Sequence, residues 1–137
     1  MIVEELNKRS TGTLPGLMGI QILEAGPGRL KSQLKIRREL LAPNGYLHAG
    51  TVVTIADTTC GYGTVANLPP GGESFTTIEL KTNFLGTARE GVILCEASMV
   101  HGGRTTQVWD ANVVDASTGR AIAVFRCTQL ILYPRES

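Results

Sequence analysis

The stretch HAGTVVTIADTTCGYGTVA, residues 48–66, determines how this chain folds. It contains no proline, its apolar residues fall all round a helical wheel, and its length suits about five turns of α-helix. A helix that is apolar on every side is a buried helix. We therefore predict one long buried helix over residues 48–66 and expect the other elements to fold around it.

Asp57 is the one formally charged residue between Leu41 and Gly72. An unpaired carboxylate is costly to bury or takes up a proton, so a chain rarely places one in a buried helix without a partner or a use. The alternative is a structural carboxylate that is paired with an arginine or with backbone N–H groups. Asp57 is on this ground the first candidate for a functional residue.

Two glycines, Gly61 and Gly63, lie in the second half of the predicted helix. Each costs a helix interior about 1 kcal/mol relative to alanine, so a close neighbour is expected to offset that cost. A strand, another helix and a ligand chain are the candidates for this neighbour, and strand packing is favoured.

Length and charge exclude several classes of protein. The 137 residues suit a single domain, 1–137, that buries most of its apolar surface in one core. The formal net charge is +1 and the basic residues are scattered, which disfavours nucleic-acid binding. No apolar run approaches about twenty residues, and the start MIVEELNKRS lacks the features of a signal peptide. We expect a cytoplasmic protein that does not bind a membrane.

Three cysteines, Cys60, Cys95 and Cys127, make an odd count and lack the spacing of metal ligands. Each stands among apolar neighbours. Buried free thiols are therefore predicted, and no metal site is expected.

Strands are predicted on both sides of the helix. Residues 17–25 and 30–37 alternate apolar and polar side chains around a Gly-Pro-Gly turn, which indicates a hairpin, and residues 1–8 form a short helix at the domain edge. The run Pro69-Pro70-Gly71-Gly72 ends the long helix near Asn67. Four further strands, the first of them half-buried, are predicted over residues 74–85, 92–100, 105–114 and 121–132.

This order of elements leaves no room for crossover helices, so the sheet should be antiparallel. The predicted fold class is α+β, with an antiparallel sheet of five to six strands wrapped around one long central helix. A single sheet covers only one side of that helix, so a partner subunit is expected on the other side. We therefore expect a homo-oligomer.

A helix wrapped by an antiparallel sheet is the hotdog architecture, and Asn44, His48-Ala49-Gly50 and Asp57 resemble the signature of its acyl-CoA thioesterases. The spacing of nine residues between His48 and Asp57 is similar to that of the phenylacetic-acid-degradation (PaaI-like) branch. Residues 76–91 and 101–129 also resemble that branch in type and spacing. The chain departs from the family at Ala49, where glycine is usual, and at Asn44, which lies nearer the histidine than the family's asparagine often does.

The spacing of His48 and Asp57 bears on the chemistry. Nine helical residues rise about 13.5 Å over two and a half turns, so the two side chains point to nearly opposite sides and cannot form a dyad within one chain. One active site would then combine the helix start of one subunit with Asp57 of another, as the resemblance implies. The helix start offers free N–H groups at Ala49 and Gly50 for a thioester oxygen that becomes an oxyanion. Phosphate binding is the competing use.

The resemblance suggests roles for single residues. Asp57 acts either as the nucleophile that forms an anhydride or as the general base that activates water, and both routes stay open. Thr77 occupies a position where related thioesterases carry a Ser or Thr that helps to hold the water, or it simply suits a strand. His48 is expected to brace the loop rather than to carry protons. Asn44 is either a turn former or a contact of the reacting group.

Coenzyme A carries phosphates, and a groove needs cations to bind them. Arg104 is the first candidate, followed by Lys81 and Arg89, and a solvated surface charge is the alternative for each. No cofactor is expected, because coenzyme A is part of the substrate.

The leading hypothesis is a homo-oligomeric acyl-CoA thioesterase, a dimer or tetramer with its sites at the subunit interface. It would hydrolyse a thioester to a carboxylic acid and coenzyme A without a metal or redox cofactor. The acyl group, aromatic or aliphatic, stays open. A hotdog hydratase or dehydratase and a non-catalytic acyl-thioester-binding module are the alternatives.

Overall fold

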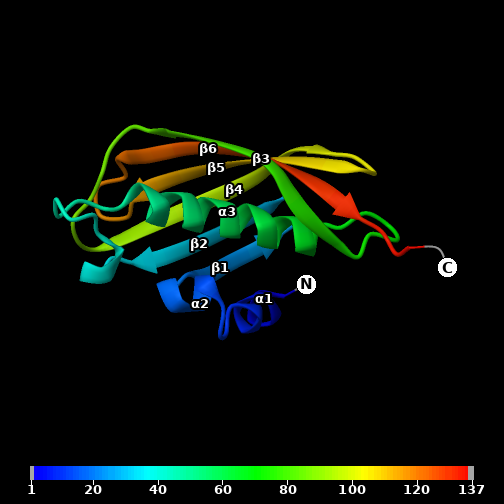
Figure 1. The fold of residues 1–137 in the computed structure, drawn as a ribbon, viewed down its shortest axis with the longest axis horizontal. Helices are drawn as coiled ribbons and strands as arrows, with labels where there is room; N and C mark the ends of the chain where they lie inside the picture. The colour runs from blue at the N-terminus through cyan, green and yellow to red at the C-terminus, as the bar shows by residue number, and fades with distance from the viewer. Residues whose placement is uncertain (1, 136–137) are drawn as a thin grey trace.

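A six-stranded sheet wraps around one long helix, α3 (Ala49–Ala66), in the computed structural model, which describes residues 2–135 (Figure 1). The strands lie in the order β1-β2-β4-β5-β6-β3, and every neighbouring pair is antiparallel. The predicted α+β class, with an antiparallel sheet around a central helix, is confirmed. The strands are β1 (Gln21–Gly26), β2 (Arg29–Lys35), β3 (Ser74–Phe84), β4 (Val92–Gly102), β5 (Thr106–Asp115) and β6 (Ala121–Leu132).

The two glycines of α3 lie against aromatic rings. A Cβ atom on Gly63 would lie 2.7 Å from the ring of Trp109 on β5, and one on Gly61 would lie 3.0 Å from the ring of Phe75 on β3. A methyl group does not fit at these distances, so glycine is what lets the strands approach the helix so closely. The prediction that a strand packs on both glycines is confirmed.

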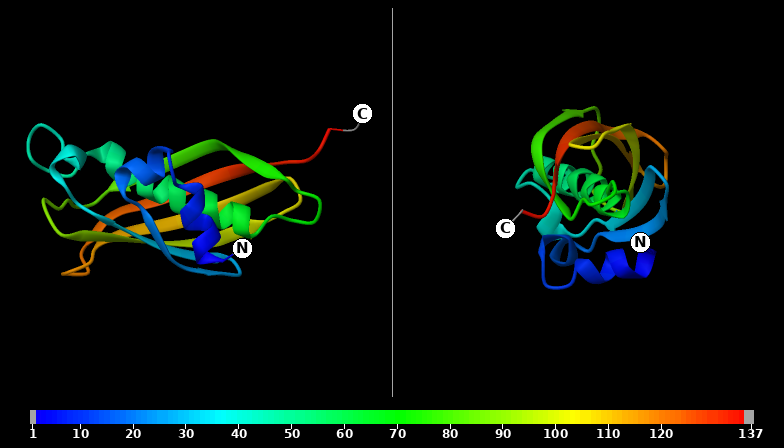
Figure 2. Two further views of the ribbon diagram at one scale, coloured as in Figure 1. Left: turned by 90° about the horizontal axis from the view of Figure 1, so that it is seen from below. Right: turned by 90° about the vertical axis from the view of Figure 1, so that its right-hand side faces the viewer.

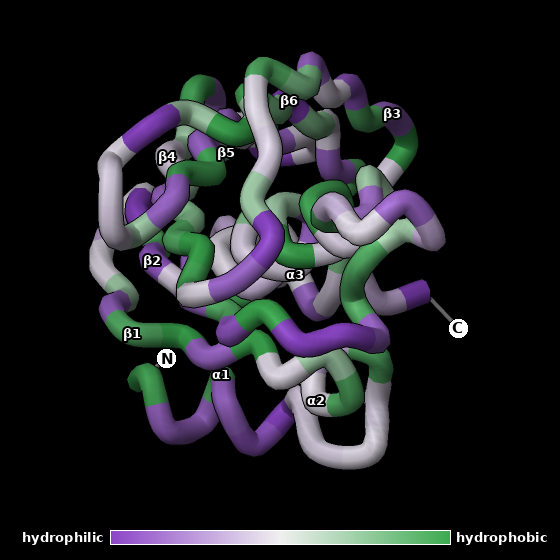
Figure 3. The backbone as a smooth tube through the Cα atoms, turned by 90° about the vertical axis from the view of Figure 1, so that its left-hand side faces the viewer, coloured by the Kyte–Doolittle hydropathy of each residue, from purple (hydrophilic) through white to green (hydrophobic). Residues whose placement is uncertain are grey.

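The core lies between α3 and the inner face of the sheet. Figure 3 views the molecule from the end where α3 begins and shows this helix with strands around it. Ile55 on α3, Leu34 on β2 and Ile93 on β4 are all fully buried, and each such side chain stabilises the fold by about 1.5–3 kcal/mol. The three cysteines are buried and free, as predicted: Cys60, Cys95 and Cys127.

The N-terminal segment differs from the sequence prediction. It forms two short helices, α1 (Val3–Arg9) and α2 (Leu14–Met18), so the strand predicted over residues 17–25 is wrong at its start. Pro15 suits the first turn of α2, and Gly19 ends that helix with a φ of 79°. The helix predicted over residues 1–8 corresponds to α1, although residue 1 lies outside the described residues.

The helices α1 and α2 cover the β1 edge of the sheet and reach α3 (Figure 2). The Asn7 side chain accepts a hydrogen bond from the Ile22 N–H at 2.8 Å and donates one to the Ile22 carbonyl at 3.1 Å, as a neighbouring strand would. The hydroxyls of Ser10 and Tyr62 lie 2.8 Å apart and join this segment to α3. The open side of the helix is therefore partly covered within the chain, which corrects the expectation that only a partner would cover it.

The other edge strand, β3, has an outer edge that no described element covers. Its side chains are mostly exposed, so the prediction of a half-buried strand is wrong for this chain by itself. Ile78, Leu80 and Phe84 are 56%, 43% and 49% exposed. The reason is that β3 has a neighbour on one side only, which leaves apolar surface along its free edge.

Candidate active site

His48 caps the start of α3, which follows the short 3-10 helix η1 (Arg38–Leu40) and a loop. Its Nδ1 accepts a hydrogen bond from the Gly50 N–H at 2.7 Å, and so satisfies one of the donors that every helix leaves unpaired at its start. This contact agrees with the expected bracing role, although His48 braces the helix rather than the loop. The Gly50 N–H was predicted to be free, and that prediction is wrong because the His48 side chain occupies it.

Ala49 keeps a free donor at the same place. The N–H groups of Thr51 and Val52 both donate to the His48 carbonyl, at 3.0 and 3.3 Å. Within residues 2–135, no group accepts the N–H of Ala49, and this residue is exposed. The helix dipole adds partial positive charge there, so the Ala49 N–H suits an anion or a developing oxyanion.

Asp57 lies about two helical turns beyond that donor and is partly buried. Its Oδ1 is buried, and no donor among the described residues reaches it. Burial raises the pKa of this carboxyl above its ordinary value of 3.8. In the part of the chain that the structure describes, no arginine, lysine or histidine forms an ion pair with Asp57, so the alternative of a structural salt bridge is not met within one chain.

Asp57 belongs to a stripe along α3 that remains partly open. Gly50, Val53, Thr54 and Asp57 share one face of the helix, because they are spaced three and four residues apart, and none of them is fully buried. Ile55, on the opposite side, is completely buried. The helix is therefore not enclosed all round within one chain, and Asp57 lies on its open stripe.

Thr77 on β3 is bonded to a residue that the sequence analysis missed. Its Oγ1 donates to Oε1 of Gln129 at 2.6 Å, and the two residues are directly opposite each other in the β3–β6 register. Gln129 is fully buried. The alternation of β6 contained the signal, because Gln129 shares its inward-facing positions with Phe125, Cys127 and Ile131.

Asn44 forms a turn. Its Oδ1 accepts a hydrogen bond from the Tyr46 N–H at 3.1 Å, two residues further on, and the residue is exposed. This is the Asx-type turn that asparagine favours. Of the two interpretations of Asn44, the turn former is the one that the structure contains.

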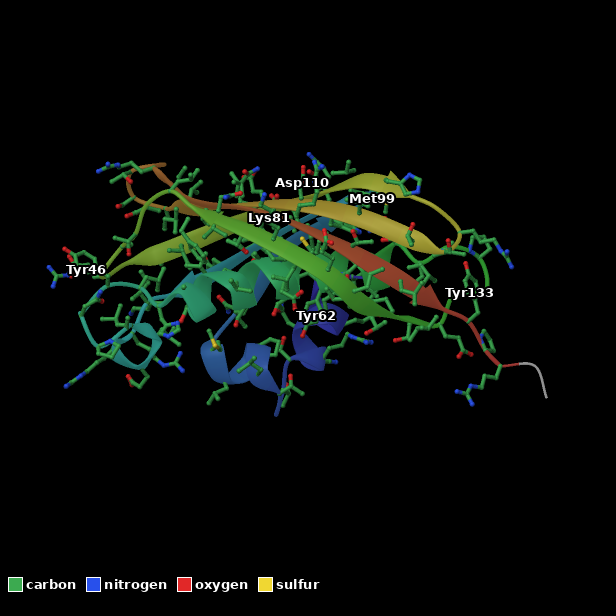
Figure 4. The ribbon with its side chains drawn as sticks, turned by 45° about the horizontal axis from the view of Figure 1, so that its top comes forward. Tyr46, Tyr62, Lys81, Met99, Asp110 and Tyr133 are labelled. Carbon is green, nitrogen blue, oxygen red and sulfur yellow. The ribbon has the colours of Figure 1, made fainter. Side chains whose placement is uncertain are left out.

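The three candidate cations do not gather at one place. Arg89 lies over the Tyr46 ring, 4.8 Å from its centre, beside the loop that leads into α3. Arg104 lies 5.7 Å from the centre of the Tyr133 ring. Figure 4 shows Tyr46 and Tyr133 at opposite ends of the molecule, with Lys81 between them. Of the three, Arg89 is therefore the cation at the helix-start end.

Two grooves lie on the outer face of the sheet, away from α3. One, of about 340 Å³, is lined by side chains that include Arg29, Lys31 and Glu96, and the other, of about 270 Å³, is lined by side chains that include Lys81 and Arg126. Neither groove is lined by the start of α3 or by Asp57.

Two further properties bear on function. Among the described residues, no group of three or more His, Cys, Asp or Glu side chains is placed to hold a metal ion. Over the same residues, every helix is too short or too polar to cross a membrane.

Comparisons with known proteins place the chain beside thioesterases. The profile of the thioesterase superfamily matches residues 44–126. The 1,4-dihydroxy-2-naphthoyl-CoA hydrolase of Listeria monocytogenes is 30% identical over 119 residues, which are 87% of this chain and 95% of that protein.

Solved structures of thioesterases are similar to this chain as well. A thioesterase family protein from Silicibacter pomeroyi is 30% identical with a TM-score of 0.85, and the alignment covers 96% of both chains. A mutant thioesterase from Pseudomonas aeruginosa has a TM-score of 0.90 over 96% of this chain and 94% of its own, and at 24% identity it supports the fold alone. The predicted hotdog fold is confirmed, whereas the narrower likeness to the phenylacetic-acid-degradation branch stays a prediction.

Proposed function

Because this chain belongs to the thioesterase superfamily and is by that membership a thioester hydrolase, we propose that it hydrolyses an acyl-CoA to a carboxylic acid and coenzyme A. The observation that carries the proposal is Asp57, a carboxylate on the open stripe of α3 with a buried oxygen that has no donor among the described residues. A buried oxygen of this kind is expected to find its partner in water, in substrate or in a second subunit.

Asp57 acts as a general base in the proposed mechanism. A carboxylate whose pKa is raised by burial is a better base near neutral pH than an ordinary one. It removes a proton from water, the water oxygen bonds to the thioester carbon, and the carbonyl becomes an oxyanion beside the Ala49 N–H. The C–S bond then breaks, and the proton on Asp57 passes to the departing thiolate. Direct attack by Asp57 to form a mixed anhydride is the alternative, and hydroxylamine trapping of that anhydride distinguishes the two.

A second copy of the chain completes the proposed site. Asp57 and the Ala49 N–H are too far apart along one helix to act on one carbonyl, since eight residues rise about 12 Å. The exposed apolar side chains of β3 offer a surface for a second subunit, which would bring a second α3 close to the first. We therefore propose a homo-oligomer, a dimer or tetramer, with two-subunit sites. Sedimentation of the purified protein tests this directly, and a monomer at assay concentration that remains active overturns it.

The substrate is proposed from two features. The Listeria relative is named for a naphthoyl-CoA, so aromatic acyl groups come first in the panel to be tested. Arg89 lies at the same end of the molecule as the start of α3 and is proposed to bind a phosphate of coenzyme A. The cytoplasmic location and the lack of a metal or redox cofactor stay predictions of the sequence.

The test is an assay of free thiol release from aromatic and aliphatic acyl-CoAs. We expect turnover of at least one thioester, and a loss of about 10³-fold in kcat for Asp57→Asn with the fold retained. Asn is nearly isosteric with Asp but cannot accept a proton. Equal rates for the wild type and Asp57→Asn would overturn the mechanism.

The same panel distinguishes the alternatives. Tight acyl-CoA binding without thiol release would assign the chain to the binding modules. Reversible addition of water to an enoyl-CoA would assign it to the hydratases.

A further inference from the structure

Three buried side-chain atoms of the described chain have no hydrogen-bond partner. They are Oδ1 of Asp57 on α3, Oγ1 of Thr82 on β3 and Nε2 of Gln129 on β6. Buried polar atoms are nearly always bonded, to protein or to ordered water. The three elements that carry these atoms are in contact, because β3 pairs with β6 and both strands pack on α3.

Thr77 on β3 lies opposite the helical turn of α3 that carries Asp57. The Phe75 ring lies against Gly61, one helical turn beyond Asp57. A strand rises about 3.3 Å per residue and a helix about 1.5 Å, so Thr77 is about 7 Å further along β3 and Asp57 about 6 Å back along α3. Because β3 runs opposite to α3 (Figure 1), these two displacements bring Thr77 beside the turn of Asp57.

The hydrogen bond between Thr77 and Gln129 sets the polarity of the Thr77 hydroxyl. Its single proton is donated to Gln129 Oε1 at 2.6 Å, so the lone pairs of the hydroxyl are the only hydrogen-bonding capacity that it has left. The Gln129 amide is fully buried and keeps two N–H donors without an acceptor. A glutamine in this state is costly for stability, and bound water is the ordinary remedy.

We propose that Gln129 is a positioning residue that binds the hydroxyl proton of Thr77, so that Thr77 offers a lone pair to the water that Asp57 activates. The inference rests on the proposed thioesterase function and adds Gln129 to it. In the step itself, one water proton goes to Asp57, the other is bonded to Thr77, and the freed electron pair forms the bond to the thioester carbon.

A double-mutant cycle tests this role. Thr77→Val and Gln129→Met are each expected to lower kcat about tenfold with KM unchanged, since the first removes the hydrogen bond to the water and the second removes the bond that orients the Thr77 hydroxyl. If Gln129 acts through Thr77, the double variant loses about tenfold, not about a hundredfold. Multiplying losses, or a wild-type rate for Gln129→Met, would overturn the proposal.

Rescue by a conservative variant sharpens the test. Gln129→Glu keeps an oxygen that accepts the Thr77 proton, and in this buried position its carboxyl is expected to be neutral. We expect its kcat to stay within about threefold of wild type where Gln129→Met loses tenfold. A folded Gln129→Glu protein that is as slow as Gln129→Met contradicts the role. If Gln129→Glu does not fold, the kcat of Gln129→Met is the test of the proposal.

Gln107 supplies the matched control. It is also a buried glutamine and is opposite Gln129 in the β5–β6 register. Its Nε2 donates to the Asn67 carbonyl and its Oε1 accepts from the Trp109 indole N–H, each at 2.8 Å. Gln107→Met should lower the melting temperature and leave kcat of the folded protein unchanged. If the wild type releases no thiol, the proposed function fails. If Asp57→Asn abolishes the activity but Gln129→Met keeps the wild-type kcat, the proposed function stands and only the role of Gln129 fails.

Discussion

Two polar side chains of α3, only two residues apart, differ in burial and in hydrogen bonding. Thr59 is completely buried, donates to the Ile55 carbonyl at 2.6 Å, and lies 2.6 Å from the hydroxyl of Ser32, which is buried as well. Because the one proton of Thr59 goes to Ile55, Ser32 is the donor between the two hydroxyls. Asp57 has a buried oxygen to which no described residue donates.

The difference separates stability from function along one helix. On the closed side, every hydrogen bond of Thr59 is made inside the chain, so removing its hydroxyl should lower the free energy of unfolding. On the open stripe and at the start of α3, the hydrogen-bonding capacity of Asp57 and of the Ala49 N–H is left for something outside the chain. Substitutions of these groups should lower kcat while the protein stays folded.

Ala49→Pro should show the largest effect at the start of α3. Ala49 is the first residue of α3, where proline is well tolerated, and His48 before it is already extended with a ψ of 137°. The substitution deletes one N–H that no described residue uses. We expect unchanged stability and a fall in kcat of about 10²–10³-fold, as for loss of an oxyanion donor. Steady-state kinetics beside a thermal melt measure both, and an unchanged kcat removes Ala49 from the site.

Mixed oligomers sharpen the same comparison. If each site combines one helix start with the Asp57 of a partner, an Ala49→Pro chain paired with an Asp57→Asn chain retains one intact site. Random mixing of the two inactive proteins makes half of the dimers mixed, and each mixed dimer has one intact site out of two. About a quarter of the wild-type activity should therefore return. No recovery after verified subunit exchange would show that each site lies within one chain.

Thr59→Val should show the largest effect on the closed side. Valine has nearly the same shape, but the Ser32 hydroxyl then loses its buried acceptor. We expect the free energy of unfolding to fall by about 1–3 kcal/mol, measured by urea denaturation, with kcat of the folded protein unchanged. The double variant Ser32→Ala, Thr59→Val should recover part of that loss, because both partners are gone. A drop in kcat for Thr59→Val would break the proposed separation.

His48→Ala tests the boundary between the two kinds of residue. Its imidazole caps the Gly50 N–H, so removal should lower the free energy of unfolding by about 1 kcal/mol. Since a bracing residue carries no proton, we expect kcat to fall by less than about tenfold. Chemical denaturation and kinetics on the same preparation give both values. A fall as large as that of Asp57→Asn would make His48 part of the chemistry.

The pH dependence of stability should show the smallest effect, because Asp57 is only partly buried. Its pKa in the folded protein is raised above 3.8 by burial, so the folded state binds the proton more tightly than the unfolded state. Stability is therefore highest below the unfolded pKa and falls as the pH rises through the folded one. The difference between wild type and Asp57→Asn in free energy of unfolding should follow that trend. A difference that is constant with pH would mean that Asp57 is not desolvated.

The candidate site was predictable in part. The sequence marks Asp57 and the start of α3 as candidates, because one charge in an apolar helix and a His-Ala-Gly start are visible in the chain itself. The Gly50 N–H was misjudged, since an N-cap bond depends on the rotamer of His48. Gln129 was missed, although the alternation of β6 placed it on the inner face, because its importance arises from Thr77 on a strand that is far away in sequence.

The sequence by itself determined most of the elements and their kind: one long apolar helix between strands, a hairpin at a Gly-Pro-Gly turn, and glycines at positions of close approach. Local periodicity and turn chemistry suffice for these, because each depends on residues close together in the chain. Only the tertiary structure decided that β3 lies at an open edge beside β6, and that α3 has a closed side and an open stripe. Those properties depend on which distant strands pair, and hence on the packing of the whole chain at once.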